Sequence, residues 1–180
     1  MGSIDIISKP LTQAELTSRY EALIDDPRYS SVQGRLELNA WGQIIMTPPA
    51  DVWHYRLSAR LGRLLVGALG GEAFQEGAVA CEGFGTLIAD VVWCSPAFLA
   101  AHAHERVLQR APEICVEVVS PTNVIAKLEQ KIQAYLAAGA VEGWIVFEDL
   151  TVRMFDRGGE RSQSQFAVDL TAWRRELGQG

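Results

Sequence analysis

The sequence has few features that mark a secreted or membrane-bound protein. Among its 180 residues only three are cysteines, Cys81, Cys94 and Cys115. They form no CxxC pair and lie in apolar, strand-like runs, so we expect reduced core residues. No apolar run reaches the roughly 18 residues that span a bilayer. Residues 1–5 lack the basic and then apolar pattern of a secretory signal. These absences predict a soluble, cytoplasmic protein with no membrane partner.

Basic residues are also scarce. The chain has 16 Lys and Arg against 22 Asp and Glu, a net charge of -6 and a pI near 5.1. Because phosphate affinity comes mostly from Lys and Arg, this balance argues against a broad nucleic-acid-binding surface. Any nucleic-acid role must therefore be local and metal-assisted. What the chain does have is 48% hydrophobic residues, enough for one compact domain over residues 1–180.

Hydrophobic periodicity and turn residues predict a mixed α/β (α+β) sheet with helices packed on it. Thr12 and Glu15 form a capping box at the start of a first helix, and residues 120–123, Ser-Pro-Thr-Asn, are expected to cap the helix that follows them. We expect helices over residues 12–24 and 51–69, a short helix that begins at residue 96, and a further helix that ends at residue 138. We expect strands over residues 35–38, 43–46, 73–80, 86–93, 114–119, 144–147, 151–155 and 164–168.

Two acidic residues interrupt otherwise apolar strands. Asp90 lies in the run Leu-Ile-Ala-Asp-Val-Val-Trp, and Glu117 lies in the run Ile-Cys-Val-Glu-Val-Val. A carboxylate desolvated in a sheet costs several kcal/mol unless a cation or a donor compensates it. Lys131 follows at the border of the buried face of the next helix and can reach inward. Each signal alone is more typical of a salt bridge or a solvated side chain, but their combination suggests a metal site.

Phosphodiester cleavage is one chemistry that fits this combination. It needs a divalent ion to polarise the phosphate, and Mg²⁺ prefers a few carboxylate oxygens with waters completing its octahedron. Asp90 and Glu117 could supply those oxygens. A nearby lysine such as Lys131 can orient the attacking water or neutralise charge that builds on the phosphate.

Several motifs, taken in order, resemble a known family. They include residues 112–123, Lys131 and Tyr135, residues 138–146, and upstream the segments 36–38, 45–49 and 89–91. Together they resemble the Uma-two (Uma2) family of bacterial restriction-endonuclease-like proteins, within the PD-(D/E)xK nuclease superfamily, over about residues 30–155. The resemblance implies a restriction-endonuclease-like mixed sheet flanked by helices, with an N-terminal helix and a C-terminal strand or tail appended. It also implies Mg²⁺ or Mn²⁺ as cofactor, DNA as substrate and a homodimer.

The resemblance implies roles for individual residues. Asp90 and Glu117 become the metal-binding acids, and Lys131 becomes the catalytic lysine. The superfamily usually has that lysine two residues after the strand acid, where this chain has Val119, so Lys131 is a migrated equivalent. Glu37 matches a third acidic group that would bind the metal or position water. It could equally face solvent.

Other matches leave alternatives open. His54 matches a histidine that begins the long helix, either for substrate binding or for a local hydrogen bond only. The family usually has Pro where this chain has Ala89, and an acid where it has Lys127. Lys127 precedes Lys131 by four residues and should repel it modestly. This change either weakens metal binding or adds a phosphate contact.

A basic stripe on the second helix is the last candidate. Arg56, Arg60 and Arg63 recur at helical spacing and either track a phosphate backbone or form an ordinary exposed face. Two functions therefore stay open. The first is a Mg²⁺-dependent endonuclease that uses Asp90, Glu117, Lys131 and Glu37. The second is a binding or interaction module that keeps the nuclease fold without turnover.

Overall fold

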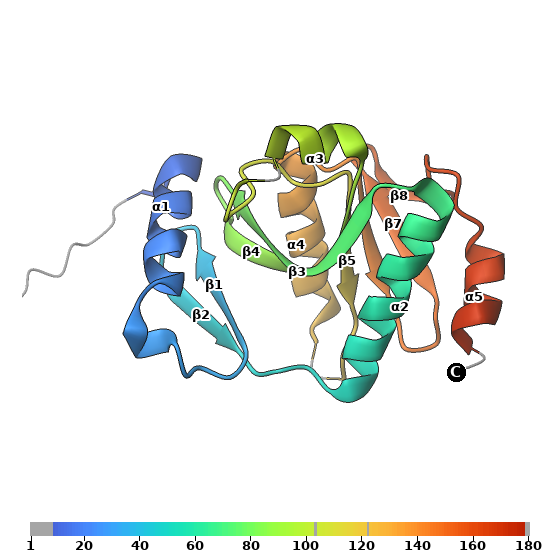
Figure 1. Ribbon diagram of the computed structural model, residues 1–180, viewed down its shortest axis with the longest axis horizontal. Coiled ribbons are helices and arrows are strands. Elements are labelled where there is room, and N and C mark those ends of the chain that lie inside the picture. Colours follow the sequence, from blue (N-terminus) through green and yellow to red (C-terminus); the bar gives the residue numbers. More distant parts are fainter. Residues whose placement is uncertain (1–8, 103, 122, 179–180) are drawn as a thin grey trace, which may run out of the picture.

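The structure is a computed structural model that describes residues 9–102, 104–121 and 123–178 (Figure 1). The expectation of a cytoplasmic protein drew partly on residues 1–5, which lie outside the described residues. No helix of the described ranges is long and apolar enough to cross a membrane. Within the same ranges, all three cysteines are buried and free, as expected.

The described residues form one mixed, eight-stranded sheet with helices on both faces. Its order is β2-β1-β4-β5-β6-β7-β8, and β3 pairs with β4 off this path. The strands are β1 (Arg35–Asn39), β2 (Ile44–Thr47), β3 (Glu72–Cys81), β4 (Gly85–Cys94), β5 (Ile114–Val118), β6 (Glu142–Val146), β7 (Val152–Asp156) and β8 (Gly159–Arg161). The helices are α1 (Gln13–Ile24), the 3-10 turn η1 (Pro27–Tyr29), α2 (Val52–Leu69), α3 (Pro96–His102), α4 (Ile125–Ala137) and α5 (Leu170–Gly178). The predicted fold class is confirmed.

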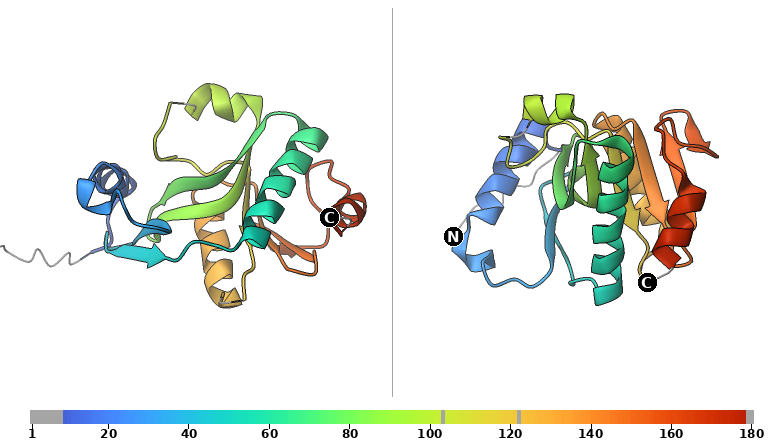
Figure 2. Two further views of the ribbon diagram at one scale, coloured as in Figure 1. Left: turned by 60° about the horizontal axis from the view of Figure 1, so that its bottom comes forward. Right: turned by 45° about the vertical axis from the view of Figure 1, so that its right-hand side comes forward.

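Two of the three hydrophobic cores among the described residues lie on opposite faces of the sheet. Because side chains alternate along a strand, Val92 and Cys115 join α3 and α4 in one core, whereas Val91 and Val116 join α2 and α5 in the other. Strands β5 and β6 are parallel and buried throughout, with α4 as the connection between them. Figures 1 and 2 show α2 and α4 on opposite sides of these central strands.

Strand β4 has one neighbour on one edge and two on the other. β3 pairs with it from Gly85 to Cys94. The opposite edge is shared, because β1 pairs with Gly85 and Thr86 whereas β5 pairs with residues 91–93. Within the part of the chain that the structure describes, residues 87–90 have no strand neighbour on that edge. We call this gap the sheet fork.

The prediction of a closing strand over residues 164–168 is wrong, and β8 is the strand that forms instead. The segment is held by a buried carboxylate at the start of β6. Glu142 accepts hydrogen bonds from Trp144 Nε1 at 2.7 Å, from Ser164 Oγ at 2.8 Å and from the Gln165 amide. These contacts fix the segment across the α2–α5 core, so its alternating pattern packs without pairing.

Two helix starts also differ from expectation. Helix α5 was not predicted, although Asp169 Oδ1 accepts a hydrogen bond from the amide three residues later at 2.9 Å. For α4, the expected cap by residues 120–123 is wrong, because the N-cap is Val124 and it makes no side-chain cap bond. Asn123 Oδ1 instead accepts from the Ser120 amide at 2.7 Å and closes the preceding turn. Residue 122 lies outside the described residues.

Candidate active site

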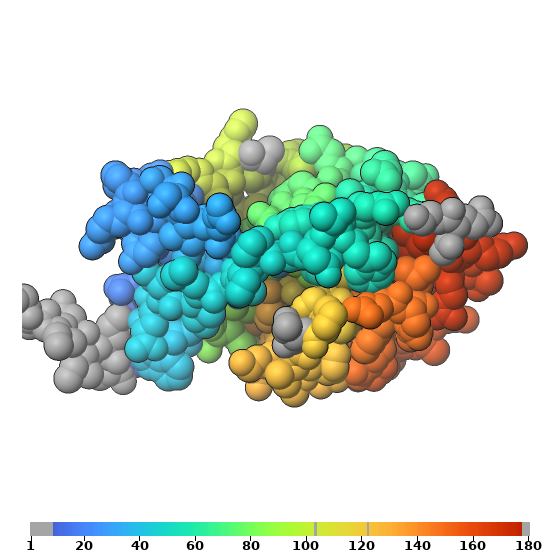
Figure 3. All heavy atoms as spheres, turned by 90° about the horizontal axis from the view of Figure 1, so that it is seen from below, coloured from blue at the N-terminus to red at the C-terminus, as the bar shows by residue number. Residues whose placement is uncertain are grey.

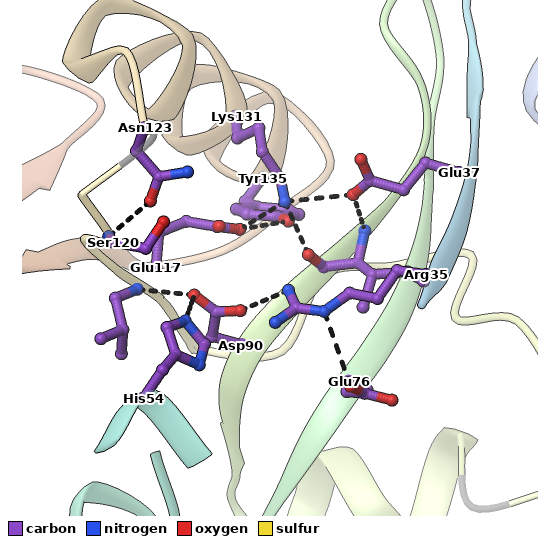
Figure 4. A network of polar contacts seen from close by, with 12 residues as sticks. Arg35, Glu37, His54, Glu76, Asp90, Glu117, Ser120, Asn123, Lys131 and Tyr135 are labelled. Atoms are coloured by element: carbon purple, nitrogen blue, oxygen red, sulfur yellow. Dashed lines mark hydrogen bonds and ion pairs between the residues drawn. The ribbon is translucent and has the colours of Figure 1, made fainter. Parts of the chain in front are cut away.

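Lys131 lies between two carboxylates at the sheet fork. Its Nζ is 3.1 Å from Glu37 Oε1 and 3.0 Å from Glu117 Oε1, and it donates to Ile88 O at 2.7 Å. Glu37 Oε1 also accepts a hydrogen bond from Ile88 N at 2.7 Å. Figure 4 shows these side chains pointing toward one another. Glu37 and Lys131 thus satisfy the backbone groups of Ile88, for which the fork provides no strand.

Glu117 is the most deeply buried acid of this group, with 2% of the residue exposed. Burial raises its pKa to about 7; the Lys131 ammonium opposes that shift, and the charges of Asp90 and Glu37 add to it. Tyr135 donates its hydroxyl to Glu117 Oε1 at 2.8 Å and fixes the carboxyl orientation.

Lys131 keeps its proton at this position. Burial favours the neutral amine, but the neighbouring Glu117, Glu37 and Asp90 carboxylates outweigh burial and hold the pKa of Lys131 above its usual range. An ammonium has three donors and no acceptor. Lys131 therefore acts as a fixed positive charge and a donor, and it cannot accept a proton from water.

Asp90 lies in the same fork, on β4, with 3% of the residue exposed. Its Oδ2 accepts from Val118 N at 2.7 Å and contacts His54 Nε2 at 3.1 Å. Its Oδ1 forms an ion pair with Arg35 Nη1. Burial alone would raise the pKa of Asp90, but the His54 hydrogen bond and the Arg35 charge outweigh it and lower that pKa. Asp90 is therefore ionised, and His54 Nε2 is the donor.

Arg35 and Glu76 are members of the site that the sequence analysis did not identify. Arg35 lies two residues before Glu37 on β1, and its Nε is 3.5 Å from Glu76 Oε1. Glu76 has a φ of 59°, a left-handed conformation that is uncommon for residues other than glycine. In the pairing of β3 with β4, the residues on either side of Glu76 pair with the residues on either side of Asp90. The only sequence signal for Arg35 was its spacing of two residues from Glu37, because residues two apart on a strand lie on one face of the sheet.

The site gathers more acidic than basic side chains. Four carboxylates, from Glu37, Glu76, Asp90 and Glu117, surround the two cationic side chains. When all four are ionised, two negative charges are left uncompensated. Across the described ranges no three His, Cys, Asp or Glu side chains gather as a complete metal cage. Mg²⁺ keeps several waters and needs only one or two carboxylates, and Asp90 and Glu117 are the two acids that could hold it.

The other predicted substrate-binding residues lie elsewhere. Arg56 and Arg60 follow His54 by two and six positions, so they project from the far side of α2. Both line a pocket beside Glu148 and α5. Lys127 is exposed in the first turn of α4, one turn before Lys131. Of this group only His54 joins the site, through its contact with Asp90.

The site lies between elements that diverge at the molecular surface. Figure 3 shows a recess between the β1–β2 hairpin and the segment leading into α2 on one side and the start of α4 on the other. Strand β1 carries Arg35 and Glu37, and α4 carries Lys131.

Comparisons with known proteins agree with this architecture. The sequence model of the Uma2 family, described as "Putative restriction endonuclease", matches residues 19–178. Among solved structures, the chain is similar to one described as a "putative nuclease belonging to DUF820" from Anabaena variabilis ATCC 29413. The match has a TM-score of 0.69 and 16% identity, and it covers 93% of this chain and 99% of that one. At this identity the likeness shows the fold alone. No curated protein matches the chain.

Proposed function

This chain belongs to the Uma2 family of "putative restriction endonucleases", and from that membership we propose that it is a divalent-metal-dependent endonuclease of the PD-(D/E)xK type. The family and the fold support a nuclease that acts on nucleic acid. The observation that carries the finer proposal is the position of Lys131 Nζ, within 3.1 Å of both Glu37 and Glu117 at the sheet fork that holds Asp90. Mg²⁺ or Mn²⁺ is the proposed cofactor, and DNA is the proposed substrate.

Each side chain has a proposed task that follows from its contacts. Asp90 and Glu117 offer carboxylate oxygens for the ion, and His54 and Tyr135 hold those two carboxylates in place. A bound divalent ion supplies Lewis acidity toward the phosphate and a lowered pKa for water. Lys131 supplies a permanent positive charge beside the phosphate as negative charge accumulates there.

Glu37 has a positioning role in this proposal. Its Oε1 contacts both Lys131 Nζ and the Ile88 amide, so it sets how far the ammonium extends across the fork. A shorter or neutral side chain at this position would let Lys131 turn fully toward Glu117. We expect Glu37→Gln to keep the Ile88 hydrogen bond and to weaken the hold on Lys131.

Cleavage assays test the proposal directly. Purified protein is incubated with plasmid DNA, labelled single-stranded DNA and labelled RNA, with Mg²⁺, with Mn²⁺ or with EDTA. We expect metal-dependent cleavage that Asp90→Asn and Lys131→Ala reduce by about a hundredfold or more. Arg106→Gln, which alters an exposed ion pair with Asp25, is the control and should cleave normally. Circular dichroism confirms that each variant is folded.

The proposal fails if wild-type protein cuts neither DNA nor RNA with either ion and calorimetry detects no metal binding that Asp90→Asn removes. That result would favour the second function, a binding module that keeps the nuclease fold. The observation on its side is that Asp90 is already paired within the chain, with Arg35, His54 and the Val118 amide.

We also propose that two copies act together. Cutting both strands of a duplex is simplest with two sites related by a two-fold axis. Sedimentation equilibrium of the purified protein tests this part, and a single species of 19.8 kDa would contradict it.

A further inference from the structure

Arg35 competes for the carboxylate that the proposed metal site needs. Its Nη1 is paired with Asp90 Oδ1, and only 12% of its side chain is exposed. The other carboxylate oxygen, Oδ2, is occupied by His54 Nε2 and Val118 N. A guanidinium and a divalent ion are drawn to the same lone pairs of Oδ1. A cation that binds Asp90 through Oδ1 therefore competes with Arg35 for that oxygen.

Glu76 offers Arg35 a second position. Its Oε1 lies 3.5 Å from Arg35 Nε, and its side chain is 47% exposed. Figure 4 shows Arg35 between Asp90 and Glu76. The first of these carboxylates is buried and the second lies at the surface. The φ of 59° at Glu76 departs from regular strand geometry beside Asp90. Glu76 is therefore an acidic partner that Arg35 already contacts besides Asp90.

We infer that Arg35 is a phosphate-binding residue of this site, released from Asp90 when the ion binds and kept at the fork by Glu76. This inference rests on the proposed nuclease function. A guanidinium has five donors in a planar fork that fits two phosphate oxygens, which suits it to this second partner. Lys131 stays between Glu37 and Glu117, so Arg35 is the cation that changes partner.

The inference predicts two opposite effects of one substitution. Arg35→Gln removes the competitor, so calorimetry with Mn²⁺ or Mg²⁺ should show binding about tenfold tighter than in wild type. The same variant loses its phosphate contact, so KM for nucleic acid should rise about tenfold. Arg35→Lys keeps the positive charge but lacks the planar guanidinium, so its KM should lie between the values of wild type and Arg35→Gln. A residue that served folding alone would not tighten metal binding while weakening substrate binding.

Matched variants separate this effect from a general change in charge. Arg106→Gln removes one positive charge from an exposed pair with Asp25, and its metal affinity and KM should stay within about twofold of wild type. Glu76→Gln removes the second partner of Arg35, so its metal affinity should fall, because the arginine then stays on Asp90.

Each outcome decides the inference. Unchanged or weaker metal binding in Arg35→Gln, or an unchanged KM, overturns it while leaving the proposed nuclease function intact. Metal binding by Arg35→Gln but not by wild type supports it strongly. Binding by neither protein defeats the proposed function and the inference together. If Arg35→Gln does not fold, Arg35→Lys decides, since a normal KM in a folded lysine variant excludes a bidentate phosphate contact.

Discussion

Replacing Lys131 with Met should destabilise the protein by an amount that grows with pH. The substitution keeps the length and apolar stem of the side chain but removes the ammonium that contacts Glu37 and Glu117. Breaking a buried ion pair by removing one partner costs about 3 to 5 kcal/mol, because the other charge is left uncompensated. We expect this full cost near pH 8.5, where Glu117 is ionised in the wild-type protein.

The pH dependence follows from Glu117. Its pKa of about 7 lies above the ordinary value of 4.5, so folding takes up a proton between these values. The associated stability is complete below pH 4.5 and is lost as pH rises through about 7. Without Lys131 the pKa of Glu117 rises further. The variant therefore continues to lose this stability at pH values above 7, where the loss in the wild-type protein has ended. The cost of the substitution should therefore be smallest near pH 5.5.

Urea unfolding, followed by tryptophan fluorescence and far-ultraviolet circular dichroism, measures this cost at pH 5.5, 7.0 and 8.5. Lys127→Met is the matched control, because Lys127 is exposed one turn earlier on α4. Its free energy of unfolding should change by no more than about 0.5 kcal/mol at any of these pH values. A Lys131→Met cost that is constant with pH, or equal to that of the control, would refute the electrostatic argument.

Three further predictions concern single substitutions. Gly143→Ala should cost about 1 to 3 kcal/mol in urea unfolding, because the new Cβ would lie 2.6 Å from Ile132 Cγ2. Glu142→Gln should cost about 1 to 3 kcal/mol and speed proteolysis after β8, since an amide cannot accept all of the bonds that Glu142 accepts. Tyr135→Phe removes the hydroxyl that donates to Glu117 at 2.8 Å, which raises the pKa of Glu117, so the pH at which Mg²⁺ binding reaches half its maximum should move upward in calorimetry.

Helices α1 to α4 and most strands could be predicted because their patterns are local. The apolar stripes of α2 and α4 repeat at helical spacing, and their buried faces include Leu61 and Ile132. The segment of residues 164–168 was predicted wrongly because its structure depends on a distant contact. Residues 164–168 alternate like a strand, but the deciding contact is the Glu142 carboxylate, more than twenty residues earlier. A pattern within the segment could not reveal that partner.

The residues of the site also fall into those that the sequence pattern identified and those that it did not. Asp90, Glu117 and Lys131 stood out because charges in apolar elements need partners, and the structure places them at one fork. Arg35 did not stand out, since an arginine at the start of a strand usually faces solvent. Its partner Asp90 is 55 residues away, and only the pairing of β1 with β4 brings the two together. Arg56 and Arg60 show the reverse, because their helical spacing suggested a surface for phosphate but their face of α2 is turned from the fork.

The sheet fork restricts the substitutions that the fold can accept at Glu37 and Lys131. Glu37 and Lys131 complete the hydrogen bonding of Ile88, so selection for a stable fold alone would favour side chains of these shapes at both positions. Apolar replacements would leave a bare amide and carbonyl inside the protein. Relatives without nuclease activity should therefore carry uncharged isosteres, such as glutamine at the position of Glu37, in place of apolar residues.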